Sequence, residues 1–226
     1  MKSMKRTILA IFMALALTII PTGCEEYLVE KDETTDTLSV NELGIPSLSQ
    51  ELEIEDEDFT LICEYDTGNY PLENWKVTDS KAITMKVKTK GLPEGTEVYI
   101  DHVHADISLK STSAQINGIT QDTMDDTFHG VSQDGFFIND TSEYYNIFSI
   151  EGYTCQFYEM WGLCFGTYGT VSSSYERLTE NNIIKVGTYA EKLSIVYDLS
   201  IKTPDSDKMY TKSVLSEVLI PLQKTE

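Results

Sequence analysis

The three histidines of the chain, His102, His104 and His129, lie within 28 residues of one another. His102 and His104 are two residues apart. Alternate residues of a β-strand point to the same face about 6 to 7 Å apart, so these two imidazoles would share a face with Asp106. Two imidazoles from a strand and a third from a loop can bind zinc or copper. The spacing therefore makes His102, His104 and His129 a candidate metal site.

Strand alternation also explains these histidines without any metal. Val103, Ala105, Ile107 and Leu109 would form the buried face of the same strand, and the histidines would then lie on its solvated face. We favour this interpretation, because His-x-His without a nearby third ligand is a weak motif. A contact that responds to pH is a third interpretation, since histidine changes charge near neutral pH.

A run of aromatic residues provides a second candidate site. Nine aromatic side chains lie between Tyr144 and Tyr168. Aromatic side chains with polar tips are good anchors for peptides and sugars, and they are equally good core residues of a β-sandwich. Alternation would turn about half of them inward. We expect the exposed part to be a binding platform at the bend of this segment, made by Tyr158, Met160 and Trp161.

Cysteine and the known catalytic motifs give little support to an enzyme. Cys63, Cys155 and Cys164 are odd in number. In one interpretation a disulfide joins Cys155 to Cys164 across a hairpin. In the other, all three are isolated buried thiols. The sequence contains no Gly-x-Ser-x-Gly, no His-Glu-x-x-His, no glycine-rich phosphate loop and no calcium-binding loop. We therefore expect a non-enzymatic protein.

The elements that must position these residues have the two-residue period of β-strands. Turn-forming residues separate them at 91–95 and 203–208, and a short helix is expected near 173–181. Strands are expected over 59–65, 82–88, 98–109, 145–157, 183–186, 193–201 and 210–222.

Short strands joined by polar turns predict an all-β protein with little helix. The expected fold is an antiparallel β-sandwich, immunoglobulin-like in its general architecture. The Cys-Trp-Cys arrangement of true immunoglobulin domains is missing, so the prediction concerns the architecture alone. We expect a single domain over residues 59–226, which is long enough to bury a core.

The N-terminus has the order of a secretory signal. Lys2, Lys5 and Arg6 precede an apolar run over residues 7–20, which ends in Pro21-Thr22-Gly23-Cys24. This ending resembles the lipobox of bacterial surface lipoproteins, such as those of Gram-positive bacteria. The resemblance implies cleavage before Cys24, acyl chains on its thiol and a location on the outer face of the cell membrane. A retained span is not expected, because 14 helical residues cover about 21 Å of an apolar layer about 30 Å thick.

Residues 24–58 are strongly acidic and are expected to form a disordered tether. Like charges at this density resist collapse, and a flexible coil of this length would reach about 30 to 35 Å. The alternative is that Val40–Leu52 docks on the domain as a strand or a turn around Gly44-Ile45-Pro46. One cation, Lys31, stands among thirteen carboxylates: Glu25, Glu26, Glu30, Asp32, Glu33, Asp36, Glu42, Glu51, Glu53, Glu55, Asp56, Glu57 and Asp58.

The overall charge excludes two kinds of partner. The formal net charge is −20, and removal of residues 1–23 takes away three cations and no acid, which leaves −23. Nucleic acids and anionic lipid surfaces both require a cationic face. Contact with the membrane is therefore expected through acyl chains at Cys24, and we expect no nucleic-acid partner.

These observations favour a lipid-anchored binding module outside the cytoplasmic membrane. It would engage another surface protein or a component of the cell wall, without an enzymatic activity or a cofactor. The alternative is an extracytoplasmic zinc- or copper-binding protein, or a metal-dependent hydrolase, with His102, His104 and His129 as ligands.

Overall fold

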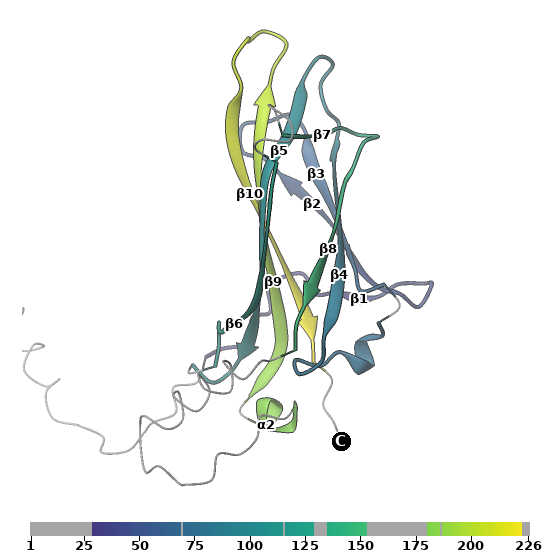
Figure 1. Ribbon diagram of the computed structural model, residues 1–226, viewed down its shortest axis with the longest axis vertical. Coiled ribbons are helices and arrows are strands. Elements are labelled where there is room, and N and C mark those ends of the chain that lie inside the picture. Colours follow the sequence, from purple (N-terminus) through teal and green to yellow (C-terminus); the bar gives the residue numbers. More distant parts are fainter. Residues whose placement is uncertain are drawn as a thin grey trace, which may run out of the picture.

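β-Strands make up almost all of the regular structure in the computed structural model of this chain (Figure 1). The structure describes residues 29–68, 70–114, 116–128, 135–152, 180–185 and 187–222. The strands of these residues form two antiparallel sheets that pack face to face, and a short 3-10 turn and a short α-helix accompany them. The antiparallel β-sandwich predicted from the sequence is confirmed.

The first sheet has the strand order β1-β2-β3-β4-β8, and each pair of neighbours is antiparallel. The 3-10 turn η1 (Leu72–Asn74) lies in the connection from the third strand to the fourth. The bounds of the strands are β1 Ser39–Val40, β2 Pro46–Glu53, β3 Thr60–Asp66, β4 Lys81–Lys90 and β8 Tyr144–Ile150.

The second sheet has the order β10-β9-β5-β6, with β7 paired to the same edge of β5 as β6. Its two longest strands, β5 and β9, pair with each other over almost their whole lengths. The bounds are β5 Glu97–Ser111, β6 Thr120–Thr127, β7 Phe136–Ile138, β9 Thr188–Lys202 and β10 Tyr210–Pro221.

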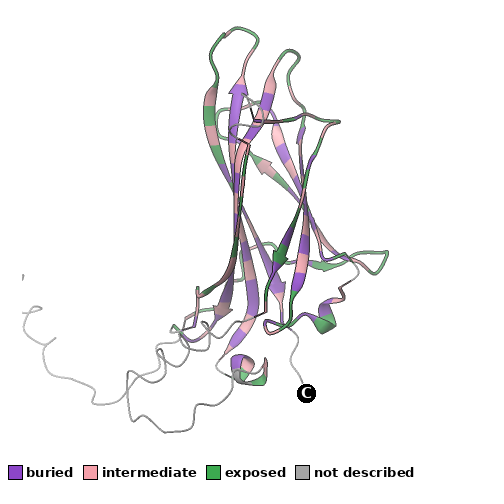
Figure 2. Cartoon of the chain, in the orientation of Figure 1, coloured by how far each residue is buried: buried purple, intermediate pink, exposed green. Residues whose placement is uncertain are grey.

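Buried residues recur along the strands of both sheets (Figure 2), and their side chains form one hydrophobic core. Alternation along the strands produces it, since residues that point inward are apolar and their neighbours are polar. Large rings fill the space between the sheets. The largest buried side chains include Trp75, Tyr65, Tyr144, Tyr197 and Phe148.

One bulge in β5 decides which of its residues face outward. Val98 and Ile100 are buried on the N-terminal side, whereas Val103 and Ala105 are buried on the C-terminal side. The pairing with β9 shifts between Ile100 and His102, and a β-bulge of one residue exchanges the two faces of a strand. The buried face predicted over 103–109 is therefore confirmed, and the histidines lie on the opposite face.

The first ten described residues are part of the sandwich and are called the N-terminal strap, residues 29–38. The backbone N–H of Val29 donates to the carbonyl of Thr112 at 2.7 Å. At the other end of the strap, the N–H of Leu38 donates to the carbonyl of Leu219 at 2.8 Å, and Leu38 is fully buried. The strap therefore runs from the end of β5 to the edge of β10 before the chain enters the first sheet.

The expectation of a disordered tether over residues 24–58 is wrong for residues 29–58. After the strap, β1 and β2 pair with each other and β2 pairs with β3, so the alternative of a docked segment over Val40–Leu52 is confirmed. The acidic side chains of β2 point outward, while Gln50 and Ile54 are buried. The carboxylates of β2 remain in water because the alternation of the strand places all of them on its outer face.

The strand expected over 183–186 is wrong, because Glu180–Lys185 forms the α-helix α2. The run Ile183-Ile184 is too short to distinguish a strand from a helix by its period. Ile183 is buried in the core, and through this apolar side chain the helix α2 contacts the sandwich. The part of the helix expected over 173–179 lies outside the described residues, as does the strand expected over 153–157.

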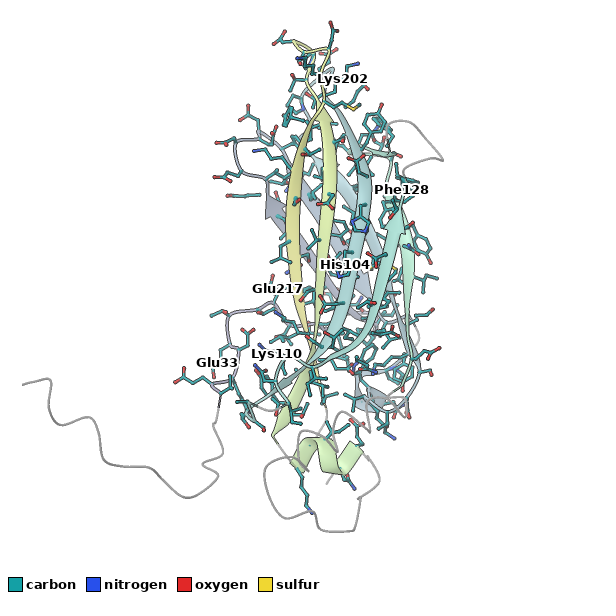
Figure 3. All side chains as sticks on the ribbon, turned by 60° about the vertical axis from the view of Figure 1, so that its left-hand side comes forward. Glu33, His104, Lys110, Phe128, Lys202 and Glu217 are labelled. Atoms are coloured by element: carbon teal, nitrogen blue, oxygen red, sulfur yellow. The ribbon has the colours of Figure 1, made fainter. Side chains whose placement is uncertain are left out.

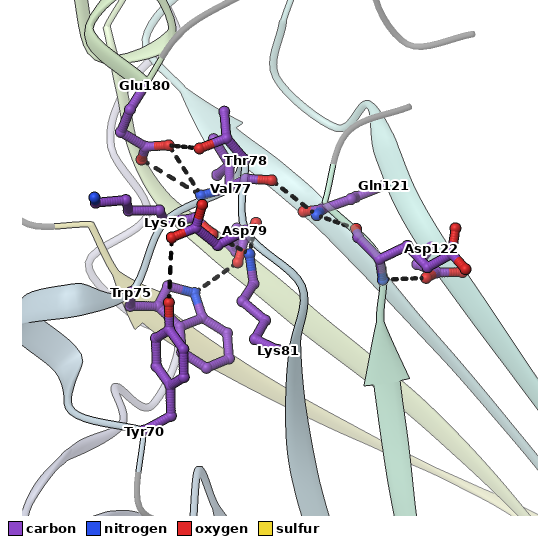
Figure 4. Close-up of polar contacts among 12 residues, drawn as sticks. Tyr70, Trp75, Lys76, Val77, Thr78, Asp79, Lys81, Gln121, Asp122 and Glu180 are labelled. Atoms are coloured by element: carbon purple, nitrogen blue, oxygen red, sulfur yellow. Dashed lines mark hydrogen bonds and ion pairs between the residues drawn. The ribbon is translucent and has the colours of Figure 1, made fainter. Parts of the chain in front are cut away.

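A buried ion pair joins the two sheets beside α2 (Figure 4). Lys81 at the start of β4 contacts Glu191 of β9 at 3.0 Å, and both side chains are fully removed from water. The indole N–H of Trp75 donates to the second oxygen of Glu191 at 2.6 Å, and the Lys81 ammonium lies 5.0 Å from the centre of the Trp75 ring. Each charge therefore has its partner inside the protein, as a buried charge requires.

Hydrogen bonds around this pair hold α2 and the edges of the sheets together. Glu180 of α2 accepts a hydrogen bond from the backbone N–H of Val77 at 3.1 Å. The side-chain amide of Gln121 donates to the carbonyls of Val77 and Glu151, at 3.1 and 2.8 Å, and so bridges β6 to the residues after β8 (Figure 4). The end of the sandwich that carries α2 is therefore a connected polar network.

Substitution Lys81→Met should lower the free energy of unfolding by about 3 to 5 kcal/mol, because it leaves the Glu191 carboxylate buried without its counter-charge. Urea denaturation followed by circular dichroism measures this change. Lys90→Met is the matched control: Lys90 pairs with Glu51 at 2.6 Å, but both side chains are about half exposed and screened by water, so its loss should change stability far less than Lys81→Met does. Equal effects of the two substitutions would contradict the role assigned to the buried pair.

Candidate functional site

His102 and His104 are neighbours on the outer face of the second sheet. Their ring centres are 6.4 Å apart, and their side chains are 30% and 41% exposed. Figure 3 labels His104 on β5. The two imidazoles come from β5, which is an interior strand between β9 and β6. The sequence-based expectation that both share one solvated face is confirmed.

One carboxylate oxygen binds both histidines. Oδ1 of Asp125 lies 3.0 Å from Nε2 of His102 and 2.8 Å from Nδ1 of His104. Asp125 is on β6, directly opposite His104 in the strand register. Polar contacts between cross-strand neighbours stabilise a sheet at such positions, so the three side chains tie β6 to the interior of the sheet.

A second carboxylate approaches His102 from the other side. Nδ1 of His102 lies 3.2 Å from Oδ2 of Asp198 on β9, which is its partner in the register. The hydroxyl of Ser213 on β10 donates to Oδ1 of Asp198 at 2.6 Å. A row of polar side chains therefore crosses all four strands, from Asp125 to Ser213, and we call it the histidine–aspartate row.

This geometry determines the protonation of His102. An ionised carboxylate can only accept hydrogen bonds, and His102 has a carboxylate at each ring nitrogen, so both nitrogens donate only in the imidazolium form. Partial burial lowers the pKa of His102, but the hydrogen bonds and charges of Asp198 and Asp125 outweigh burial and raise the pKa above its usual value. The same contacts, first from His104 and then from His102, lower the pKa of Asp125.

The described part of the chain holds no group of three His, Cys, Asp or Glu side chains arranged for a metal ion. His102 and His104 are together, as the candidate zinc or copper site requires. His129 lies outside the described residues, and so does the candidate platform of Tyr158, Met160 and Trp161.

The cysteines fall into two groups. Cys63 on β3 is fully buried, and burial raises the pKa of its thiol to about 12, so the thiol stays protonated and unreactive at neutral pH. Cys24, Cys155 and Cys164 lie outside the described residues, and both the lipidation at Cys24 and the bridge between Cys155 and Cys164 stay predictions.

Sequence reasoning found the histidines but missed their partners. In the sequence, nothing distinguishes Asp125 from its acidic neighbours Asp122 and Asp126, and Asp198 carries no signal except its place in an alternating strand. Both lie far from His102 in the sequence, 23 and 96 residues away. The register of three strands had to be known before these side chains could be brought together.

No protein-family model matches the chain, and no curated protein sequence matches it. Among solved structures, the crystal structure of a protein from Archaeoglobus fulgidus aligns with 78% of this chain and 97% of that chain, at 11% sequence identity and a TM-score of 0.25. A likeness at this level carries no argument about fold or function. None of the helices in the described residues is long and apolar enough to cross a membrane.

His102 should make the stability of the protein depend on pH. Its folded-state pKa is raised, so its contribution is complete below the unfolded value of about 6.5 and is lost as pH rises through the folded value. Urea denaturation of the wild type and of His102→Gln, compared from about pH 5 to about pH 9, measures this contribution. The stability difference between them should shrink as pH rises, and parallel curves would exclude a charged His102 in the folded protein.

Proposed function

We propose that this chain is a lipid-anchored binding module on the outer face of a bacterial cell membrane. The observation that carries the proposal is the signal-like order that ends at Cys24, together with the position of Val29. Val29 is five positions after Cys24 and is already bonded to the sandwich through Thr112. The anchor would thus join the folded domain almost directly. Acyl chains on Cys24 supply the membrane contact, because a single transmembrane segment of 14 residues would be too short.

The outer surface of the sandwich supports binding rather than catalysis. Among the described residues, the thiol of Cys63 is buried, and His102 and His104 are bonded to carboxylates. Apolar side chains meanwhile remain accessible on β8, where Tyr145 and Ile147 are about half exposed on one face. Exposed aromatic and aliphatic side chains on a rigid strand are suitable contacts for another protein.

We propose a surface protein or a cell-wall component as the partner, and Tyr158, Met160 and Trp161 as candidate anchors for it. These three residues follow β8 in the chain, after Tyr145 and Ile147. The strongly acidic composition supports a partner other than nucleic acid. No enzymatic activity and no cofactor are part of this proposal.

An extracytoplasmic zinc- or copper-binding protein or metal hydrolase is the second candidate. One observation favours it: Nε2 of His102 and Nδ1 of His104 both lie within 3.0 Å of the same oxygen of Asp125. A metal would have to replace that shared contact and recruit His129 as a further ligand. Imidazoles bind metals in their neutral form, so the raised pKa of His102 opposes metal binding at neutral pH.

Calorimetric titration separates the two candidates. With zinc added to the wild type and to the double variant His102→Ala/His104→Ala, the binding-module proposal predicts the same heats for both proteins. Binding of one zinc ion by the wild type, weakened by tenfold or more in the double variant, would instead support the metal protein.

Lipidation is tested by substitution of the proposed acceptor. Cells that express the wild type are expected to incorporate a palmitate analogue into the protein and to retain it in the membrane fraction. Cys24→Ser should abolish the label and release the protein, because it removes the proposed acyl acceptor. Cys164→Ser, which removes a different thiol, should leave both properties unchanged. An unlabelled wild type recovered from the cytosol would refute the proposal.

A further inference from the structure

The N-terminal strap is held firmly where the chain enters the sandwich. The backbone N–H of Asp32 donates to the hydroxyl of Tyr189 at 2.8 Å, and its carboxylate accepts hydrogen bonds from Thr34 and Thr35 and contacts Lys110 at 3.5 Å. Burial alone would raise the pKa of Asp32, but the hydrogen bonds from Thr35 and Thr34 and the charge of Lys110 lower it to about 2. Asp32 is therefore ionised, and its contacts persist, throughout the physiological pH range.

The first residues of the N-terminal strap contact the sandwich at one end of an elongated molecule. Val29 is bonded to Thr112, next to the end of β5, and Thr112 is bonded to Gly187 between α2 and β9. We call this the α2 end. Figure 1 shows α2 and the start of β9 together at this end, and the turn from β9 to β10 at the opposite one. Fifteen residues of β9 at about 3.3 Å each separate the two ends by about 50 Å.

Two connecting turns form the opposite end, which we call the hairpin end: residues 91–96 between β4 and β5, and residues 203–209 between β9 and β10. The two turns are in contact, because a Cβ at Gly95 would lie 3.2 Å from Pro204. Residues 54–59 join them, with the Lys212 ammonium bonded to the carbonyl of Glu55 at 2.7 Å.

We infer that the sandwich stands upright on the bilayer, with its α2 end at the lipid headgroups and its hairpin end pointing away. This inference rests on the proposed acylation of Cys24. Five chain steps join Cys24 to Val29, and even a fully extended chain of that length spans only about 17 Å. The α2 end is therefore held within about 17 Å of the membrane, far less than the 30 to 35 Å reach of the expected tether.

Charge decides between a standing and a lying orientation. A short anchor alone would allow the domain to lie along the surface, but a strongly acidic protein is repelled by an anionic bilayer. Because the potential fades within about a Debye length of 10 Å, the repulsion is smallest when only one end of the domain, the anchored α2 end, lies near the headgroups. A standing domain also keeps the hairpin end outside this layer, with its seven carboxylates Glu55, Asp56, Glu57, Asp58, Glu94, Asp205 and Asp207.

Energy transfer to the membrane tests this orientation. The lipidated full-length protein is placed in anionic vesicles that contain an acceptor dye on a lipid headgroup. A donor dye is attached through an encoded azidophenylalanine, in one variant at Glu33 and in another at Asp207. Both residues are exposed, and Glu33 lies at the α2 end and points outward (Figure 3). We expect transfer to be several-fold stronger from position 33 than from position 207. Equal transfer would overturn the upright orientation, and stronger transfer from position 207 would reverse it.

Two controls separate this inference from the proposed function. Insertion of 15 Gly/Ser residues between residues 28 and 29 lengthens the connection to an average of about 25 Å, so transfer from position 33 should fall. Unchanged transfer would show that the short anchor does not set the position of the α2 end. The Cys24→Ser protein should give no transfer from either position. Transfer that persists in this variant would refute acylation at Cys24 and not the orientation itself.

Discussion

The carboxylate of Glu191 imposes the strictest requirement in this structure, because it is a charge without any access to water. Its two oxygens are satisfied by Lys81 at 3.0 Å and by the indole of Trp75 at 2.6 Å. Glu191 belongs to the second sheet and Lys81 to the first, so the pair forms only when the sheets are in one relative position. The α2 end is the place where this condition is met. The strap docks nearby, against the neighbouring Tyr189 and Thr112.

A second set of polar contacts crosses the interior farther from α2. The hydroxyl of Tyr65 on β3 donates to Ser216 of β10 at 2.6 Å and lies 3.1 Å from the hydroxyl of Tyr197 on β9. Burial is the main cause that raises the pKa of both phenols well above the usual value. These two phenols are thus neutral, and they are bonded to each other and to Ser216. On the outer face of the described part of the chain, His102 in the histidine–aspartate row has a raised pKa.

Most of the architecture was predictable because alternation is a local signal. The buried face of β5 followed from Val103 to Leu109, and the hairpin of β9 and β10 followed from two alternating runs around a turn. The strap was missed, and β2 was expected only as the alternative to a disordered tether, because carboxylates dominate the composition of this segment. The alternation of Leu48, Gln50, Leu52 and Ile54 is nevertheless present in this segment. The strap depends on contacts distant in the sequence, since the hydrogen bond from Leu38 to Leu219 joins residues 181 positions apart. Half of the histidine–aspartate row was predictable for the same reason: the histidines are local, and their carboxylates depend on strand register.

Docking of the acidic segment changes what an anchor at Cys24 would achieve. A free tether of 34 residues would let the domain search a wide zone, whereas a connection of about 17 Å below a sandwich of about 50 Å confines every surface of it to a layer about 70 Å deep. Such confinement raises the effective concentration of the domain for partners within this layer. Molecules outside the layer encounter the domain less often. A partner of the hairpin end would therefore have to extend to that layer from the wall or stand on the same membrane. With an anchor at Cys24, the fold would act as a rigid spacer, and the length of β5 and β9 would set the height at which the acidic turns meet other molecules.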